Sequence, residues 1–295
     1  MEGVTDIVFR QVVSSAARPD IFFTEFTNVS SYASEAGRNN ALERFRFLPT
    51  EQPIVAQIWG KTPEHFEITA KGLKELGFSA IDINMGCPDK HVVKTGGGSA
   101  LIKNPELAEK IIDATRLGDL PVSVKTRLGY SSTSEWRDWL SFLLSKNLAA
   151  LTIHLRTKKE MSKVEAHYEL IPEIIALKNS ISPSTKLIIN GDVENVQDGQ
   201  KFISLGADGI MIGRGIFHNP FCFEQEPKTH SREELIALLK LHLNLYDQYH
   251  PYGFEPLKRF FKIYINNFSG AATIREQLMN SHTTEEVRTI LAQIS

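Results

Sequence analysis

The sequence predicts an α/β fold: a (β/α)8 barrel of the TIM type, with its first strand missing at the N-terminus, followed by a smaller all-helical domain. Short apolar runs alternate with longer amphipathic stretches over most of the chain, which is the pattern of repeated βα units. Polar residues recur at the same end of these runs. From about residue 225 the composition changes and is typical of helices, so we expect a barrel domain over 1–224 and a helical domain over 225–295.

Seven apolar runs are candidate strands, because each is short and ends at turn residues. They span 21–27, 53–60, 80–86, 121–129, 150–157, 186–193 and 208–215. The helices between them are expected at 63–77, 104–117, 134–147, 168–180 and 195–205. An eight-stranded barrel needs one more strand, and the chain opens on a turn-like segment, "MEGVTD", that leads into a helix. We therefore expect the first strand just upstream of Met1.

The composition limits the classes of protein to consider. With 295 residues, 42% of them hydrophobic, the chain can bury one large core or two modest ones. No apolar run approaches the roughly 18 residues of a membrane span and no leader opens the chain, which indicates a cytoplasmic protein without membrane contact. Cys87 and Cys222 cannot form a disulfide framework, and no Cys/His spacing indicates a metal site. The net charge of -2 restricts any nucleic-acid binding to a local patch.

Strand parity indicates which side chains point into the barrel, because alternate residues of a strand face opposite sides. In 150–157 the apolar face is Leu151, Ile153 and Leu155, which leaves the polar residues of this run inside. The same reasoning on five strands places inside Gln57, Asp82, Asn84, Ser123, Lys125, Arg127, Thr152, His154, Arg156 and Asn190. They gather toward the C-terminal ends of the strands, where the active sites of such barrels lie.

A purely structural role is the alternative for each of these residues. A single inward His or Gln is more often a hydrogen-bonded core residue than a ligand contact. The ammonium of Lys125 is costly to bury and must meet an acceptor, for which Asp82 is the candidate in a purely structural ion pair. Cys222 lies between two phenylalanines and is expected in the core.

Glycines and an arginine follow the last two candidate strands, in "NGDV" (190–193) and "IGRG" (212–215). The loops after these two strands form the usual phosphate site of such barrels, where free backbone N–H groups and a cation bind the anion. Gly191, Gly213 and Gly215 allow a close approach of the backbone. A phosphate there, with polar side chains across the barrel mouth, suits flavin mononucleotide (FMN).

The position of Cys87 does not fit a structural cysteine. It falls just past the apolar run of 80–86, between Gly86 and Pro88, where the chain turns out of the core. A cysteine that only packs belongs inside the run. Cys87 is therefore a candidate reactive residue on a loop over the barrel mouth.

Six motifs stand in the order and spacing of a known family: "MEGVTD", "DINMGCP", "VSVKTRLG", "IHLRT", "NGDV" and "IGRG". The most specific part is "NMGCP" followed by "GGGSAL" (96–101). In these motifs, from residue 1 to about 220, the chain resembles the tRNA-dihydrouridine synthases. The resemblance implies an FMN enzyme that reduces selected uridines of tRNA to 5,6-dihydrouridine with electrons from NADPH.

The resemblance also implies roles for individual residues. Cys87 is implied to be the proton donor, and Asn84 to position the target uracil. The implied contacts of the flavin ring or ribityl chain are Met1, Gln57, Lys125 and His154, and those of its phosphate region are Asn190, Gly191, Asp192, Gly213 and Arg214. Arg127 and Arg156, which point inward, are candidate substrate contacts. No metal is implied.

The chemistry agrees with these roles. Reduction of the uracil C5=C6 bond requires hydride at C6, which flavin N5 can deliver, and a proton at C5 from the opposite face. A neutral Cys87 thiol can supply that proton. The base would have to be flipped out of the folded tRNA to reach it. The chain departs from the family pattern at His154-Leu155-Arg156-Thr157, where the family usually has His-Gly-Arg-Thr, and in the loop 158–168 that follows.

The C-terminal region carries helix signals and a basic, aromatic segment. Candidate capping boxes are Ser231 with Glu234 and Thr283 with Glu286. The segment 256–268 interleaves Lys258, Arg259 and Lys262 with aromatic residues, a mixture that suits RNA backbone and base contacts. A solvated charged face fits the composition equally well. The resemblance favours tRNA, since these enzymes carry a C-terminal helical domain that binds it.

Two other functions remain open from the residues. One is an FMN barrel oxidoreductase of the dihydropyrimidine or dihydroorotate type, acting on a free small molecule, which would have no need of the helical tail. The other is a non-catalytic RNA-binding protein on a degenerate barrel, which would have no reason to keep Cys87, Lys125 and the phosphate loops together. No obligatory protein partner is inferred.

Overall fold

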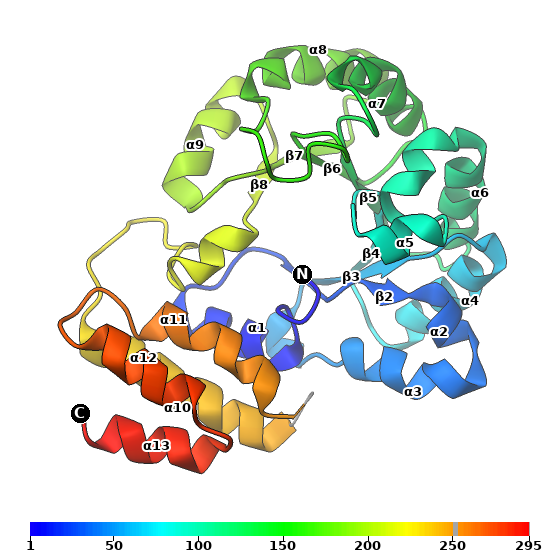
Figure 1. Cartoon of the computed structure of the whole chain (residues 1–295). Coiled ribbons are helices and arrows are strands. Elements are labelled where there is room, and N and C mark those ends of the chain that lie inside the picture. The colour runs from blue at the N-terminus through cyan, green and yellow to red at the C-terminus, as the bar shows by residue number, and fades with distance from the viewer. Residues whose placement is uncertain (250–252, 295) are drawn as a thin grey trace.

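The structure, a computed structural model, describes residues 1–249 and 253–294. Its strands pair in parallel and form one curved sheet with helices around its outer side, a half-barrel (Figure 1). In spatial order the strands are β1 (Phe22–Phe23), β3 (Ile54–Trp59), β4 (Ala80–Asn84), β5 (Val122–Arg127), β6 (Ala150–His154), β7 (Lys186–Asn190) and β8 (Gly209–Met211), with β2 (Thr27–Asn28) also paired to β3. The predicted barrel class is confirmed. In the described part of the chain the sheet is open between β8 and β1.

The helices predicted between the strands are confirmed, each end lying within three residues of its expected position. They are α4 (Pro63–Glu75), α6 (Pro105–Arg116), α7 (Trp136–Leu144), α8 (Ile171–Ile181) and α9 (Val196–Leu205). The first part of the chain adds α1 (Ile7–Ala16), α2 (Val29–Ala33), α3 (Glu35–Arg44) and α5 (Lys90–Lys94). Sequence reasoning did not predict α3, because only Ala41 of this helix is buried and its sequence has no apolar periodicity.

The candidate strand 21–27 is wrong as a single strand, since it forms β1 and β2 with a break between them. At the break the backbone N–H of Gln57 donates to the side-chain oxygen of Thr24 at 3.0 Å. The Thr24 hydroxyl thus occupies the place of a backbone acceptor in the ladder with β3. A side chain that replaces a backbone group in the ladder does not change the apolar pattern, and the strand was predicted from that pattern alone.

The register of the sheet brings the predicted inward residues side by side. Gln57 on β3 pairs with Asp82 on β4, and Asp82 with Ser123 on β5. One pleat further on, Asn84 pairs with Lys125. The pairs continue as Lys125 with Thr152, Arg127 with His154, and His154 with Asn190. The parity prediction is therefore confirmed for these residues, which form rows across the inner face, whereas Arg156 lies beyond the end of β6.

A helical region follows the sheet and packs against α1 (Figure 1). It consists of α10 (Arg232–Tyr249), α11 (Phe261–Tyr264), α12 (Ala271–Met279) and α13 (Thr284–Ala292). At its contact with α1, the ring of Phe9 lies 4.5 Å from that of Phe260 and 5.8 Å from that of His242. The division at residue 225 stays a prediction.

Both predicted capping sites lie at helix starts. At α10, Ser231 and Glu234 exchange the two hydrogen bonds of a capping box, with donor–acceptor distances of 2.8 and 3.2 Å. At α13 the backbone N–H of Glu286 donates to Thr283, but the Glu286 carboxylate accepts from the backbone of His282 instead. The second box is thus only half formed.

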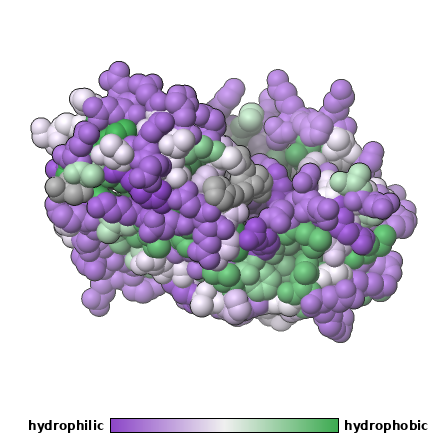
Figure 2. Space-filling view, turned by 90° about the horizontal axis from the view of Figure 1, so that it is seen from below, coloured by the Kyte–Doolittle hydropathy of each residue, from purple (hydrophilic) through white to green (hydrophobic). Residues whose placement is uncertain are grey.

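Figure 2 shows the molecule from below the view of Figure 1. This face is mainly hydrophilic, and its hydrophobic residues gather in one area. Most large apolar side chains instead belong to one buried cluster that joins the sheet, its helices and the C-terminal helices. Cys222 is 1% exposed within it, as predicted. No helix among the described residues is long and apolar enough to cross a membrane.

Candidate active site

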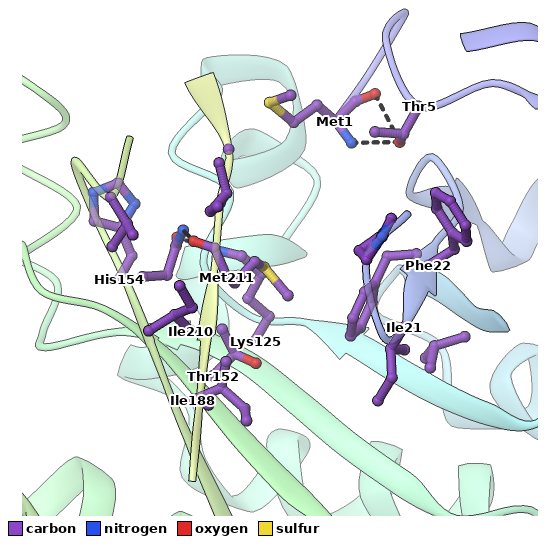
Figure 3. A pocket seen from close by; sticks show the side chains of 18 of the residues that line it. Met1, Thr5, Ile21, Phe22, Lys125, Thr152, His154, Ile188, Ile210 and Met211 are labelled. Carbon is purple, nitrogen blue, oxygen red and sulfur yellow. Dashed lines mark hydrogen bonds between the residues drawn. The ribbon is translucent and has the colours of Figure 1, made fainter. Parts of the chain in front are cut away.

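A cavity of about 1010 Å³ runs along the inner face of the sheet. Among the predicted site residues its lining includes Met1, Gln57, Asn84, Cys87, Lys125, Arg127, His154, Asn190, Gly191, Asp192, Gly213 and Arg214. Figure 3 shows Lys125, Thr152, His154 and Ile188 on one wall, with Ile21 and Phe22 across from them. The cavity also reaches Ala150 and Lys186 at the other ends of the strands. It thus joins residues that are more than 200 positions apart in the chain.

Four polar side chains beneath the mouth form a buried hydrogen-bonded row. The Gln57 amide nitrogen donates to Asp82 at 2.7 Å, and the Asn84 amide nitrogen donates to the Gln57 oxygen at 3.0 Å. Ser123 donates to the other oxygen of Asp82 at 2.7 Å. Burial raises the pKa of the Asp82 carboxyl to about 6. The carboxyl is therefore mostly ionised at neutral pH and accepts both hydrogen bonds.

Cys87 lies on the loop after β4, half-buried at the cavity. Its backbone N–H donates to the Asn84 side-chain oxygen at 2.9 Å, and its carbonyl accepts from the backbone of Ser99 at 3.1 Å. Gly98 has a φ of 57°, and a Cβ there would stand 2.9 Å from the Cys87 carbonyl oxygen. The "GGGSAL" segment therefore reaches the cysteine loop only because of this glycine.

The environment of Cys87 favours its protonated form. Burial raises the pKa of the thiol above its ordinary value, and this outweighs the opposing charges of Arg127 and Lys125. At neutral pH the group is a neutral thiol with a proton to give. A nucleophilic thiolate would need the opposite shift.

Lys125 reaches into the cavity from β5, and its ammonium donates to the Asn190 side-chain oxygen at 3.0 Å. Asn190 is itself held by donating to the Met211 carbonyl at 2.7 Å. Burial, followed by the charge of Arg127, lowers the pKa of Lys125 to about 8. Among the ion pairs of the described residues none includes Lys125, so the structural ion pair with Asp82 is wrong. The carboxylate is engaged by Gln57 and Ser123 instead.

Both arginines that were predicted to point inward are bound by the protein itself. Arg127 donates to the carbonyls of Gly86 at 2.8 Å, Thr157 at 3.1 Å and Met161 at 2.9 Å, and so joins the cysteine loop to the loop after β6. Arg156 is 2% exposed and forms an ion pair with Asp192. Arg127 lines the cavity, whereas Arg156 is not part of the lining. Their roles toward a substrate stay predictions.

His154 is neutral in this environment. Burial and the surrounding cations, of which Lys125 is the strongest, lower its pKa to about 2. Its Nε2 lies 3.1 Å from the Arg156 guanidinium, which can only donate. Nε2 is therefore the acceptor, and Nδ1 carries the ring proton. His154, which lines the cavity, thus carries one N–H donor, on Nδ1.

The predicted phosphate loops lie together at one end of the cavity. Gly191 has a φ of 118°, and the carboxylate of Asp192 accepts from Arg214 at 2.8 Å. The Arg156 and Arg214 guanidiniums hold the pKa of Asp192 below its usual range. At Gly215 a Cβ would stand 2.5 Å from the Glu194 carbonyl oxygen, so the two loops can meet only through a glycine.

Comparison with known proteins places the chain. The family model for dihydrouridine synthases (Dus) matches residues 1–295. The chain belongs to the dihydrouridine synthase family. Among its relatives in this family, a probable tRNA-dihydrouridine synthase 2 of Bacillus subtilis (strain 168) is 55% identical over 297 residues, covering 99% of this chain and 91% of the relative. A probable tRNA-dihydrouridine synthase of Staphylococcus epidermidis (strain RP62A) is 54% identical over 295 residues, covering 99% and 90%.

Two solved structures share the fold of this dihydrouridine synthase family member. A variant of NCR from Zymomonas mobilis aligns with a TM-score of 0.50 at 17% identity, covering 74% of this chain and 78% of that one. Histamine dehydrogenase from Rhizobium sp. 4-9 aligns with a TM-score of 0.56 at 14% identity, covering 75% and 43%. At such low identity these likenesses show the fold alone.

The structure also brings together residues of this family member that sequence reasoning missed. Two ammonium groups, those of Lys103 and Lys158, lie 4.3 and 4.9 Å from the centre of the Tyr130 ring. Lys158 is held there by its backbone N–H, which donates to the Gly129 carbonyl at 2.9 Å. The three side chains come from different segments: Lys103 ends the short helix Gly98–Lys103, and Tyr130 and Lys158 follow β5 and β6. No sequence signal connects them, because their separations follow only from the fold.

The three cations predicted in the tail differ in their availability. Lys258 forms an ion pair with Glu255 at 2.8 Å, and its side chain is 11% exposed. Arg259 is exposed and donates to the Gly3 carbonyl at 2.8 Å, which joins the tail to the start of the chain. Lys262 is exposed on α11. Contact of these residues with RNA stays a prediction.

Proposed function

We propose that this protein is a tRNA-dihydrouridine synthase that reduces uridines of tRNA, using FMN as cofactor and NADPH as electron donor. The observation that carries the proposal is the cavity that both the Cys87 thiol, which its surroundings keep protonated, and the partly buried Lys125 ammonium line. Membership of the dihydrouridine synthase family supports it. A cytoplasmic location, where tRNA is found, belongs to the same proposal.

The residues present fit a flavin. The Lys125 ammonium is partly buried and is bound, among described residues, only by the amide oxygen of Asn190, so it has room for a further acceptor. Met1, Gln57, Lys125 and His154 would hold the ring and ribityl chain, and Asn190, Gly191, Asp192, Gly213 and Arg214 the phosphate region. When bound, the flavin supplies the hydride for uracil C6, with NADPH as the source of electrons.

The chain's own contribution to the chemistry is a proton and the position from which it comes. Cys87 would give its thiol proton to C5 of the uracil and become a thiolate, which solvent then reprotonates. Arg127 and Asn84 hold the loop that carries Cys87, through the Gly86 carbonyl and the Cys87 backbone N–H. The loop is thus fixed before a substrate arrives, which favours proton transfer by orientation.

Cations at the barrel mouth support an RNA substrate. Lys103 and Lys158 flank Tyr130, and neither takes part in an ion pair among the described residues. Two cations beside one ring suit a phosphate together with a stacked base. A uracil within tRNA would have to be flipped out of its stack to enter the cavity. An FMN oxidoreductase for a free small molecule would need neither these cations nor the C-terminal helices.

We expect the purified protein to be yellow and to release FMN when it is denatured. The measurement is the absorption spectrum of the native protein and chromatography of the supernatant after heating. Colourless protein that takes up no FMN when titrated with it would contradict the cofactor, and release of a different flavin would correct it.

A second prediction concerns the tail. Replacing Arg259 and Lys262 with alanine is expected to weaken tRNA binding and to reduce the slope of log K against log salt by about 1–2, since each phosphate contact contributes about 0.9. Filter binding at several salt concentrations measures this.

The matched control for the tail variant removes the same number of positive charges from helices of the barrel. It combines Lys71→Ala on α4 with Lys110→Ala on α6. It should leave both affinity and salt slope unchanged. If the tail variant also binds like the parent with the same slope, Arg259 and Lys262 are a solvated face and the RNA surface lies elsewhere.

A further inference from the structure

We infer that Asp82 is a positioning residue which, through Gln57 and Asn84, fixes the loop that carries Cys87 and leaves Asn84 able only to donate to a substrate. Asp82 is fully buried beneath the cavity and is not part of its lining. It can therefore act only through other residues. The catalytic consequence of this inference rests on the proposed function, whereas its structural part does not.

The row begins at the carboxylate. The two oxygens of Asp82 accept from Ser123 and from the Gln57 amide nitrogen, both at 2.7 Å. An ionised carboxylate has no proton to donate, so it must face the nitrogen of the Gln57 amide. The Gln57 oxygen then points the other way, toward β4, where it accepts from the Asn84 amide nitrogen at 3.0 Å.

The row ends at the cysteine loop, where the same orientation is required independently. The Asn84 oxygen accepts from the backbone N–H groups of Gly86 at 3.1 Å and Cys87 at 2.9 Å. Backbone N–H groups only donate, so the Asn84 oxygen must face the loop and its nitrogen must face Gln57. Both ends therefore impose one orientation on the two amides. Turning either amide would bring donor against donor inside the core.

The orientation has a consequence for recognition. Two N–H groups occupy the Asn84 side-chain oxygen, and one N–H of its amide is used by Gln57. Asn84 lines the cavity, and its remaining capacity is a single N–H donor. It can bind a carbonyl oxygen of a uracil, and it has no acceptor for an exocyclic amino group. Asp82 thus contributes to the choice of base without touching it.

The alternative is that Asp82 only stabilises the core. A stabilising role predicts that any equally destabilising change has the same effect on Cys87. The positioning role predicts that only substitutions within the row change the reactivity of Cys87. It also predicts that a side chain which restores the acceptor for Gln57 at position 82 restores that reactivity. Asn at position 82 can present its oxygen to Gln57 and its amide nitrogen to Ser123, whose hydroxyl can then donate to the Ile81 carbonyl 3.4 Å away.

The test compares D82L, D82N and a control, L140A, in the flavin-bound enzyme. Leu140 is buried on α7 and contributes nothing to the row, but its truncation also destabilises the fold. The measurements are the rate of Cys87 alkylation by iodoacetamide, followed by peptide mass spectrometry, together with NADPH oxidation and dihydrouridine formation.

For D82L we expect the alkylation rate to change by about tenfold and dihydrouridine formation to fall by about 10–100-fold. NADPH oxidation should fall by less than dihydrouridine formation, because Asp82 reaches the flavin only through Gln57. D82N is expected to stay within about threefold of the parent in every measurement. If D82L fails to fold, S123A, which removes one donor to the same carboxylate, should shift the alkylation rate in the same direction.

The inference is overturned if L140A changes Cys87 alkylation as much as D82L does, or if D82N is as impaired as D82L. A parent enzyme that forms no dihydrouridine would refute the proposed function instead, and the alkylation rates would still decide the role of Asp82.

Discussion

Replacing Cys87 with alanine is expected to lower dihydrouridine formation by about 100–10,000-fold, the usual contribution of a positioned acid. The variant should keep its flavin and its oxidation of NADPH, because the thiol acts only on the uracil. Removal of the side chain leaves the backbone N–H of Cys87 on Asn84 and the carbonyl on Ser99. The loop should therefore keep its position, and the measured loss reports the missing proton. Mass spectrometry of tRNA nucleosides after a timed reaction gives the rates.

The other cysteine provides the control. Cys222 is 1% exposed in the core, so Cys222→Ala is expected to change stability slightly and dihydrouridine formation by less than about threefold. Since burial raises the pKa of Cys87 above the ordinary thiol value of 9.0, the parent's rate should be level through neutral pH and fall only in alkali. Unchanged turnover in Cys87→Ala would assign the proton donor to another group.

The inner face of the sheet could be predicted from the sequence because one regular period determines it. Alternation along five strands was enough to place Gln57, Lys125 and His154 on one surface, and the register aligns them as expected. The loops "NGDV" and "IGRG" were found for a related reason. Their glycines follow strands whose ends must meet at the same edge of a barrel.

The partners of these side chains could not be predicted in the same way. Strand parity correctly predicted that Arg127 points inward. Whether its guanidinium binds a substrate or the carbonyls of Gly86, Thr157 and Met161 depends on how the loops after β4 and β6 fold. The partner proposed for Lys125 was wrong for the same reason. Asp82 accepts hydrogen bonds from Ser123 and Gln57, and the Lys125 ammonium donates to Asn190 instead.

The position of Lys125 at the cavity destabilises the folded protein. Burial lowers its pKa from 10.5 to about 8, so at neutral pH the folded protein holds an ammonium that would be better solvated in the unfolded chain. A shift of this size corresponds to about 3 kcal/mol of destabilisation at neutral pH. Since the folded pKa is the lower one, this cost is complete below pH 8 and is relieved as the pH rises toward 10.5. A residue used only for packing would not be placed there.

Replacing Lys125 with methionine is therefore expected to change stability and flavin affinity in opposite directions. The flavin-free variant should be more stable than the flavin-free parent by about 1–2 kcal/mol at pH 7, the relief of burial being partly offset by the lost hydrogen bond to Asn190. Its affinity for FMN should fall by about 10–100-fold, the loss of one charge-assisted hydrogen bond. Denaturant unfolding and flavin titration measure the two quantities on the same samples.

The parent's FMN affinity should also weaken above about pH 8 as the ammonium loses its proton, and the variant's should not. Equal stability of the two flavin-free proteins would show that burial of the Lys125 ammonium does not destabilise the fold. An undiminished affinity for FMN in the variant would show that Lys125 does not hold an electron-rich group of the flavin.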